Sequence, residues 1–197
     1  MEIERTIPQA DRDSMTPKTI KSYLKDIIRF VGDDPEREGM VGTPDRVVRS
    51  WSKLYGGYNQ NPADVLKTVF QEGACQEMVG VKDVEFYSTC EHHMLPFFGR
   101  IHIAYIPDKK VVGISKLPRL IEVYARRLQI QEKMTAQIAD AIMEHLTPKG
   151  AMVHCEAQHF CMTSRGVEKQ NSKMITTAIR GSFKQIAIRQ EFMAWVR

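Results

Sequence analysis

Two short clusters of cysteine and histidine carry the most evident chemistry of this sequence. The first contains Cys90, His92 and His93, and the second contains His159 and Cys161. Cys90 and His93 are three residues apart, so a thiolate and an imidazole can reach one metal ion from a single turn. Zinc accepts both ligand types, and a catalytic zinc takes three protein ligands and keeps its fourth position for water. We therefore predict that Cys90, His93 and Cys161 bind zinc, and that His92 and His159 transfer protons.

The two remaining cysteines leave other arrangements open. Cys75 or Cys155 would supply a fourth ligand to a closed, structural zinc site. Alternatively, Cys155 and Cys161 are small core residues and His159 is a hydrogen-bonded core histidine. The two spare histidines favour the catalytic arrangement. Another divalent ion that tolerates two cysteines and one histidine remains an alternative to zinc.

A basic segment follows a predicted strand. Pro118 and a downstream apolar stripe predict that a helix begins near Lys116. A helix N-terminus binds anions through its free N–H groups, whereas cations in the first turn oppose the helix dipole. Arginine binds phosphate through two hydrogen bonds and lysine binds it as a point charge. Lys116 and Arg119 are therefore candidate phosphate ligands, with a solvated basic surface as the alternative. Weaker candidates are Arg46, Arg49 and Arg165.

Gln131 and Glu132 open the next predicted helix. An acidic residue in the first turn suits the helix dipole, which is reason enough for a glutamate there. The functional interpretation is that this carboxylate accepts two parallel N–H bonds from a guanine edge.

The elements that must position these residues divide into a helical part and a sheet. One helix is predicted from Thr16-Pro17 to Gly32, a second from Thr43-Pro44 to Gly56, and a short one from Asn61-Pro62. Residues 1–16 are polar and are expected to be frayed. We assign residues 1–75 to an N-terminal helical region and residues 76–197 to a catalytic domain.

The second part alternates strands with two consecutive helices, which indicates the α+β class with an antiparallel sheet. Strands are predicted at 84–88, 99–106, 111–115, 151–162 and 174–183. Residues 107–110 are expected to form a hairpin turn. Helices are predicted from residue 116, from residue 131 to Pro148, and at 188–196. On the strand 151–162, alternation would place His159 and Cys161 on one face.

Composition limits the classes of function. The 197 residues carry 28 basic and 24 acidic side chains, for a net charge of +4. The basic residues form no dense run, so nucleic acid is not an expected partner. No apolar run approaches the length of a membrane span, and we expect a cytoplasmic protein. In a reducing compartment, cysteines near histidines indicate a metal or catalysis more often than disulfides.

Taken together, these motifs closely resemble GTP cyclohydrolase I. The similarity runs in unbroken order from about Pro17 to the C-terminus. It is carried by Thr43-Pro44-Asp45-Arg46-Val47, Ser88-Thr89-Cys90-Glu91-His92-His93, Val112-Gly113-Ile114-Ser115-Lys116-Leu117, Arg127-Leu128-Gln129-Ile130-Gln131-Glu132 and His159-Phe160-Cys161-Met162-Thr163-Ser164-Arg165-Gly166.

The resemblance implies a tunnelling fold (T-fold) in which the sheets of several subunits join into a barrel, and a ring-shaped homodecamer with active sites at subunit interfaces. It implies conversion of GTP and water to 7,8-dihydroneopterin triphosphate and formate, the first step of folate and pterin biosynthesis. By motif position, the zinc ligands are Cys90, His93 and Cys161, and the acid–base residues are His92 and His159. The implied guanine and substrate contacts are Ser115, Gln131 and Glu132, and the implied triphosphate contacts are Lys116, Arg119 and Arg165, with Arg46 and Arg49 as further candidates.

This chemistry fits the residues. Opening the imidazole ring of guanine requires water to add at C8 while N7 takes a proton, and histidine titrates near the working pH. The main rival is a non-catalytic, zinc-stabilised nucleotide-binding protein. A zinc nucleoside deaminase would carry His-x-Glu followed by Pro-Cys-x-x-Cys, and this combination is absent from the sequence. A reductase of the same fold would not be expected to have the three ligand positions.

Overall fold

The computed structural model describes residues 14–71 and 75–196, and the chain divides into two compact units, residues 1–53 and 54–197. The polar segment predicted at residues 1–16 lies largely outside the described residues. The predicted division between a helical region and a catalytic domain at residue 75 stays a prediction. None of the helices in the described ranges is both long and apolar enough to cross a membrane.

The first unit contains two of the predicted helices. Helix α2 spans Pro17–Phe30 and is capped by Thr16, whose Oγ1 accepts a hydrogen bond of 3.2 Å from the backbone N–H of Thr19. Helix α3 spans Thr43–Leu54. Both predictions are confirmed. An ion pair between Lys21 and Asp45 ties the start of α3 to α2, so the two helices are joined by charge as well as by the loop.

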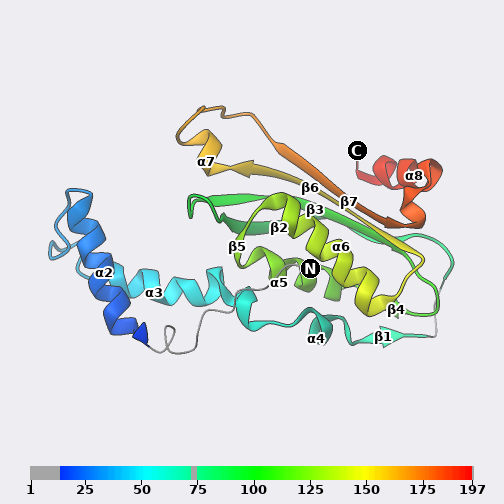
Figure 1. The fold of residues 1–197 in the computed structure, drawn as a ribbon, viewed down its shortest axis with the longest axis horizontal. Helices are drawn as coiled ribbons and strands as arrows, with labels where there is room; N and C mark the ends of the chain where they lie inside the picture. Colours follow the sequence, from blue (N-terminus) through cyan, green and yellow to red (C-terminus); the bar gives the residue numbers. More distant parts are fainter. Residues whose placement is uncertain (1–13, 72–74, 197) are drawn as a thin grey trace. The chain divides into compact units, whose positions relative to one another are not determined.

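The second unit is built on a five-stranded sheet of order β5-β2-β3-β6-β7 (Figure 1). Four strands are antiparallel to their neighbours, and the short β5 is parallel to β2. The mixed α+β class with an antiparallel sheet is therefore confirmed. The strands are β2 (Val79–Cys90), β3 (Pro96–Ile106), β5 (Leu128–Gln129), β6 (Gly150–His159) and β7 (Met174–Gly181).

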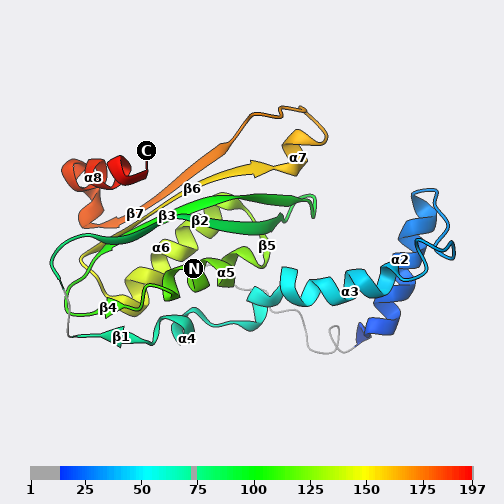
Figure 2. The ribbon, with the colours of Figure 1, turned by 180° about the vertical axis from the view of Figure 1, so that it is seen from behind.

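Helices cover both faces of this sheet. Helices α5 (Lys116–Ala125) and α6 (Gln131–Leu146) pack on one face, and α8 (Ile186–Val196) packs on the other near one end (Figures 1 and 2). Successive strand residues point to opposite faces. Accordingly, Ile103 and Val153 join the core under α5 and α6, whereas Ala104 and Met152 pack with Phe192 of α8. The smaller elements are the 3-10 turn Gly56–Asn59, α4 (Pro62–Leu66), α7 (Phe160–Thr163) and the 3-10 turn Ser182–Lys184.

The predicted hairpin through residues 107–110 is wrong. Strand β4 (Val111–Val112) pairs with β1 (Val69–Phe70) in a separate two-stranded sheet. The physical reason is that β3 is an inner strand, with β2 on one side and β6 on the other, so neither of its edges is free for β4. The predicted strand 111–115 is also shorter than expected, because Ser115 already has helical backbone angles (φ −66°, ψ −13°) at the start of α5.

The strand predicted at residues 151–162 ends earlier, at His159. Phe160–Thr163 forms the helical turn α7, closed by a hydrogen bond of 2.9 Å from the Ser164 N–H to the Phe160 carbonyl. The argument that strand alternation places His159 and Cys161 on one face was therefore wrong. Cys161 is instead positioned by the helical turn.

Candidate metal centre and active site

The loop between β2 and β3 holds the first cysteine–histidine cluster in a fixed geometry. The Cys90 N–H donates to the Leu95 carbonyl at 2.8 Å, and the Met94 N–H donates to the Cys90 carbonyl at 2.8 Å. Met94 adopts a left-handed conformation, with φ of 53°. The Glu91 N–H donates to the Gln129 carbonyl of β5 at 3.0 Å. The loop is thus closed on itself and tied to the neighbouring strand.

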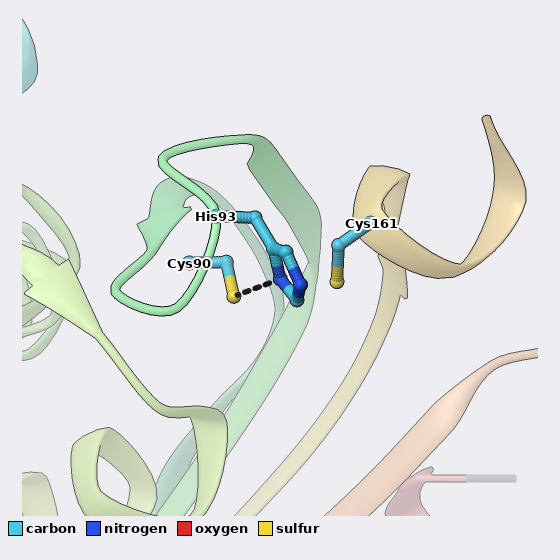
Figure 3. A group of neighbouring side chains, drawn as sticks. All are labelled: Cys90, His93 and Cys161. Carbon is cyan, nitrogen blue, oxygen red and sulfur yellow. Dashed lines mark hydrogen bonds between the residues drawn. The ribbon is translucent and has the colours of Figure 1, made fainter. Parts of the chain in front are cut away.

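The three predicted metal ligands come together at one end of the sheet. Their ligand atoms all lie within 4.8 Å of one another, and Cys90 Sγ is 3.8 Å from His93 Nδ1 (Figure 3). Cys90 is buried, Cys161 is half-buried and His93 is exposed. Zn–S and Zn–N bonds of about 2.3 and 2.1 Å place tetrahedral ligand atoms roughly 3.5 to 4 Å apart. The donor set and its spacing therefore fit a zinc-type ion.

The Cys161 thiol is affected by its surroundings. Burial, and then the neighbouring Cys90 sulfur, raise the pKa of the Cys161 thiol. Two thiolates side by side are unfavourable unless a cation lies between them, and metal binding displaces the thiol protons. The arrangement is thus suited to a divalent ion.

Neither of the other cysteines belongs to this group. Cys155 is fully buried on β6, and burial raises the pKa of its thiol to about 12, so it stays protonated. Cys75 lies in a loop, where its thiol donates to the Glu77 carbonyl at 3.7 Å. Within residues 14–71 and 75–196, the group of possible metal ligands consists of Cys90, His93 and Cys161. It has three protein ligands, as in a catalytic site.

His92 and His159 approach this group in different ways. His92 is exposed on the loop, and its Nδ1 lies 4.0 Å from Cys90 Sγ. His159 is the last residue of β6 and is half-buried. Its ring stacks on Phe97 with ring centres 4.5 Å apart and planes within 5°. Burial lowers the pKa of His159, and Glu132 partly offsets this effect. The neutral imidazole is therefore favoured.

The start of α6 lies at the same end of the sheet as the three metal ligands. Gln131 is fully buried, and its Oε1 lies 2.8 Å from His159 Nε2. Glu132, the next residue, is exposed in the first turn. Sequence reasoning missed both the burial of Gln131 and the stacking of Phe97. Phe97 pairs with His159 across β3 and β6, and no local pattern in the sequence reveals that register.

The predicted triphosphate ligands of the second unit are divided between the start of α5 and the residues that follow α7. Ser115 and Lys116 begin α5, close to β4, whereas α7 carries Cys161 at the other end of the sheet (Figures 1 and 2). Lys116 is half-buried and Arg119 is exposed, and neither forms an ion pair with another described residue. Arg165 is exposed just after α7.

Arg46 and Arg49 lie on α3, in the first unit. Arg46 donates to the Gly39 carbonyl at 3.1 Å and to Thr43 Oγ1 at 2.8 Å, so it braces the loop that precedes the helix. Arg49 lies near enough to Asp45 to contribute to lowering the pKa of that carboxyl, after the larger effect of Lys21.

Oxidising the metal-free protein is expected to link Cys90 and Cys161 by a disulfide. Their sulfur atoms already lie within 4.8 Å of each other, and a disulfide requires these two atoms to approach to about 2.05 Å. Peptide mapping by mass spectrometry, with and without bound zinc, measures the cross-link. It should form after chelation and be suppressed by zinc. Both thiols remaining free under oxidant would contradict the shared-ligand geometry.

Comparison with known proteins agrees with this geometry. Residues 20–197 match the family model of GTP cyclohydrolase I. A protein of Wolinella succinogenes described as GTP cyclohydrolase 1 is 65% identical over 179 residues, which cover 90% of this chain and 96% of that protein. A protein of the same description from Campylobacter lari is 53% identical over 174 residues, covering 88% and 92%. The crystal structure of the archaeosine synthase QueF-Like in the apo form is similar to 53% of this chain, covering 94% of that chain, with 15% identity and a TM-score of 0.45. The chain belongs to the GTP cyclohydrolase I family.

Proposed function

We propose that this protein is a cytoplasmic, zinc-dependent GTP cyclohydrolase I that converts GTP and water to 7,8-dihydroneopterin triphosphate and formate, the first step of pterin and folate biosynthesis. The observation that carries the proposal is the convergence of Cys90, His93 and Cys161 on one point, in a chain that is 65% identical to a protein named for this activity. His92 and His159 supply two imidazoles, the side chain that most often transfers protons in catalysis.

Different residues of this chain are assigned to metal binding and to proton transfer during ring opening. Cys90, His93 and Cys161 would hold the ion. The chemistry that zinc supplies at such a ligand set is a lowering of the pKa of water to about 7, which makes hydroxide available at neutral pH. His159 is half-buried beside the ligand Cys161 and is assigned proton transfer to the purine. His92, exposed next to the ligand His93, is assigned as the second proton carrier.

Recognition of guanine is assigned to the first turn of α6. The Glu132 carboxylate is exposed there and can accept two parallel N–H bonds from the guanine edge. Ser115 is assigned as a further substrate contact and is exposed at the start of α5. The Gln131 side chain is fully buried, so we assign it an indirect role through its contact with His159.

The triphosphate is assigned to Lys116, Arg119 and Arg165, with Arg46 and Arg49 as additional candidates. The start of α5 and the turn α7 lie at opposite ends of the same sheet (Figure 1), so Lys116 and Arg119 lie away from the metal ligands of their own chain, whereas the charge of Arg165 acts on the Cys161 thiol. This separation supports an active site shared between subunits. We propose a tunnelling fold in which the sheets of several subunits join into a barrel, in a homodecamer.

Substituting Lys116 or Arg119 with alanine is expected to weaken binding of GTP at least tenfold while changing guanosine binding little, because each side chain bonds only to phosphate oxygens (about 1.5–3 kcal/mol for a hydrogen bond to a charged group). Calorimetric titration of each variant with both ligands measures the difference. Lys184→Ala, at another exposed lysine, is the matched control. Equal losses for GTP and guanosine would remove the triphosphate assignment.

The activity itself is tested with GTP that carries ¹³C at C8. The proposal predicts one equivalent of labelled formate per GTP and a pterin product that becomes fluorescent on oxidation. GTP binding with neither product would favour the non-catalytic nucleotide-binding protein instead.

A further inference from the structure

We propose that Gln131 is a positioning residue that fixes the tautomer and orientation of His159. In this arrangement His159 Nε2–H is committed to a hydrogen bond with Gln131 Oε1, and Nδ1 is the ring nitrogen left for proton exchange. The inference about orientation stands on the contacts within this chain, and its consequence for turnover rests on the proposed function.

The orientation of the Gln131 amide follows from what surrounds it. Its nitrogen lies 3.2 Å from the Cys155 carbonyl oxygen, 3.1 Å from the Met174 carbonyl oxygen and 3.1 Å from Thr176 Oγ1. Carbonyl oxygens only accept hydrogen bonds. Exchanging the amide oxygen and nitrogen would press Oε1 against two carbonyl oxygens in a fully buried site. The amide nitrogen must therefore face β6 and β7, which leaves Oε1 facing His159.

A pair of threonine hydroxyls supports the same orientation. Thr135 Oγ1 donates its single hydrogen to the backbone carbonyl of Gln131 at 2.7 Å. In its contact of 2.7 Å with Thr176 Oγ1, Thr135 must then accept, so Thr176 donates. With its own hydrogen used, Thr176 can only accept from the Gln131 amide. The directions of these hydroxyl hydrogen bonds therefore agree with an amide nitrogen that faces β6 and β7.

The state of His159 follows from this orientation. Because Gln131 Oε1 can only accept, the Nε2 atom 2.8 Å away must carry a hydrogen. A neutral imidazole has one N–H, so Nδ1 then carries the lone pair. Phe97 stacks on the ring with planes within 5°, which opposes rotation that would exchange the two nitrogens. Both the tautomer and the plane of the ring are thereby set.

This role makes a kinetic prediction that differs from guanine binding. Without Gln131, His159 would distribute between tautomers and orientations, and a wrong tautomer reduces the chemical step rather than substrate affinity. For Gln131→Leu we expect kcat to fall about 10- to 100-fold, as is typical when a group that orients a catalytic or ligating histidine is lost, with KM within about threefold of its original value. A direct guanine contact would raise KM instead.

Two further variants distinguish loss of the His159 orientation from a non-specific disturbance of the structure. In Gln131→Glu, a neutral buried carboxyl group can still accept from Nε2 and donate to a backbone carbonyl, so kcat should recover to within about tenfold of the starting protein. Gln137→Leu makes the same substitution six residues along α6, at a side chain that accepts from Gln129 and does not contact His159, and should leave kcat and KM unchanged. Zinc content is measured for each variant and should be unaltered.

The direct test is magic-angle-spinning ¹⁵N NMR of the zinc-loaded protein labelled at histidine Nδ1, at a pH where the ring is neutral. The His159 signal is identified by its loss in His159→Asn. We expect an unprotonated Nδ1 in the unsubstituted protein and in Gln137→Leu, and a partly protonated Nδ1 in Gln131→Leu. A protonated Nδ1 in the unsubstituted protein would overturn the inference, even if Gln131→Leu failed to fold. Because this spectrum requires no turnover, it is independent of whether the protein releases formate from GTP.

Discussion

Replacing Cys161 with serine should lower formate release from GTP by about a thousandfold or more and remove most of the bound zinc. The remaining Cys90 and His93 form a two-ligand site, and loss of a soft thiolate removes the strongest part of the donor set. Without the ion, the water that attacks C8 keeps a pKa far above neutral. Plasma mass spectrometry for zinc per subunit and a formate assay measure both effects on the same sample.

The matched control is Cys75→Ser, since Cys75 lies in a loop and donates only to the Glu77 carbonyl. This control should keep its zinc and its activity. If Cys161→Ser retained full zinc and a rate near that of the unsubstituted protein, the three-ligand assignment would be wrong.

The second large effect is expected at His159. His159→Asn should reduce kcat by about 10²- to 10⁴-fold, the usual contribution of a positioned acid–base group, while zinc content stays near one per subunit. Burial lowers the pKa of this histidine, so the neutral ring predominates at neutral pH and must take up a proton before it passes one to the purine. Single-turnover kinetics with GTP separates this effect from slow product release.

The control for this experiment is His145→Asn, on α6, which should keep full activity. A His159→Asn protein that turned over at nearly the normal rate would assign proton transfer to another group, with His92 as the next candidate.

The helices and the metal ligands were predictable because their signals are local. Thr16 caps α2, and the apolar stripes define α5 and α6. The Cys90-x-x-His93 spacing lies within one loop, so it needs no knowledge of distant contacts. Cys161 was predicted because the second Cys/His cluster could complete the ligand set, and the structure brings it to Cys90 and His93. The placement of His159 relative to Cys161 by strand alternation was wrong, because sequence does not show where the strand gives way to a helical turn.

The parts that could not be predicted depend on pairing between distant segments. Strand β4 pairs with β1, more than 40 residues earlier in the sequence, and a turn signal at residues 107–110 gave no information about which edge was free. The contact between Gln131 and His159 likewise arises only when α6 packs against β6. A glutamine in the first turn of a helix looks the same in sequence whether it is buried or exposed.

The most direct test of the account is a formate assay on chelator-treated protein, with and without added zinc. The account predicts that formate and pterin formation are both lost on chelation and both restored at about one zinc per subunit. Full activity in protein shown to be free of metal, or zinc bound at Cys90, His93 and Cys161 with no formate released, would contradict it.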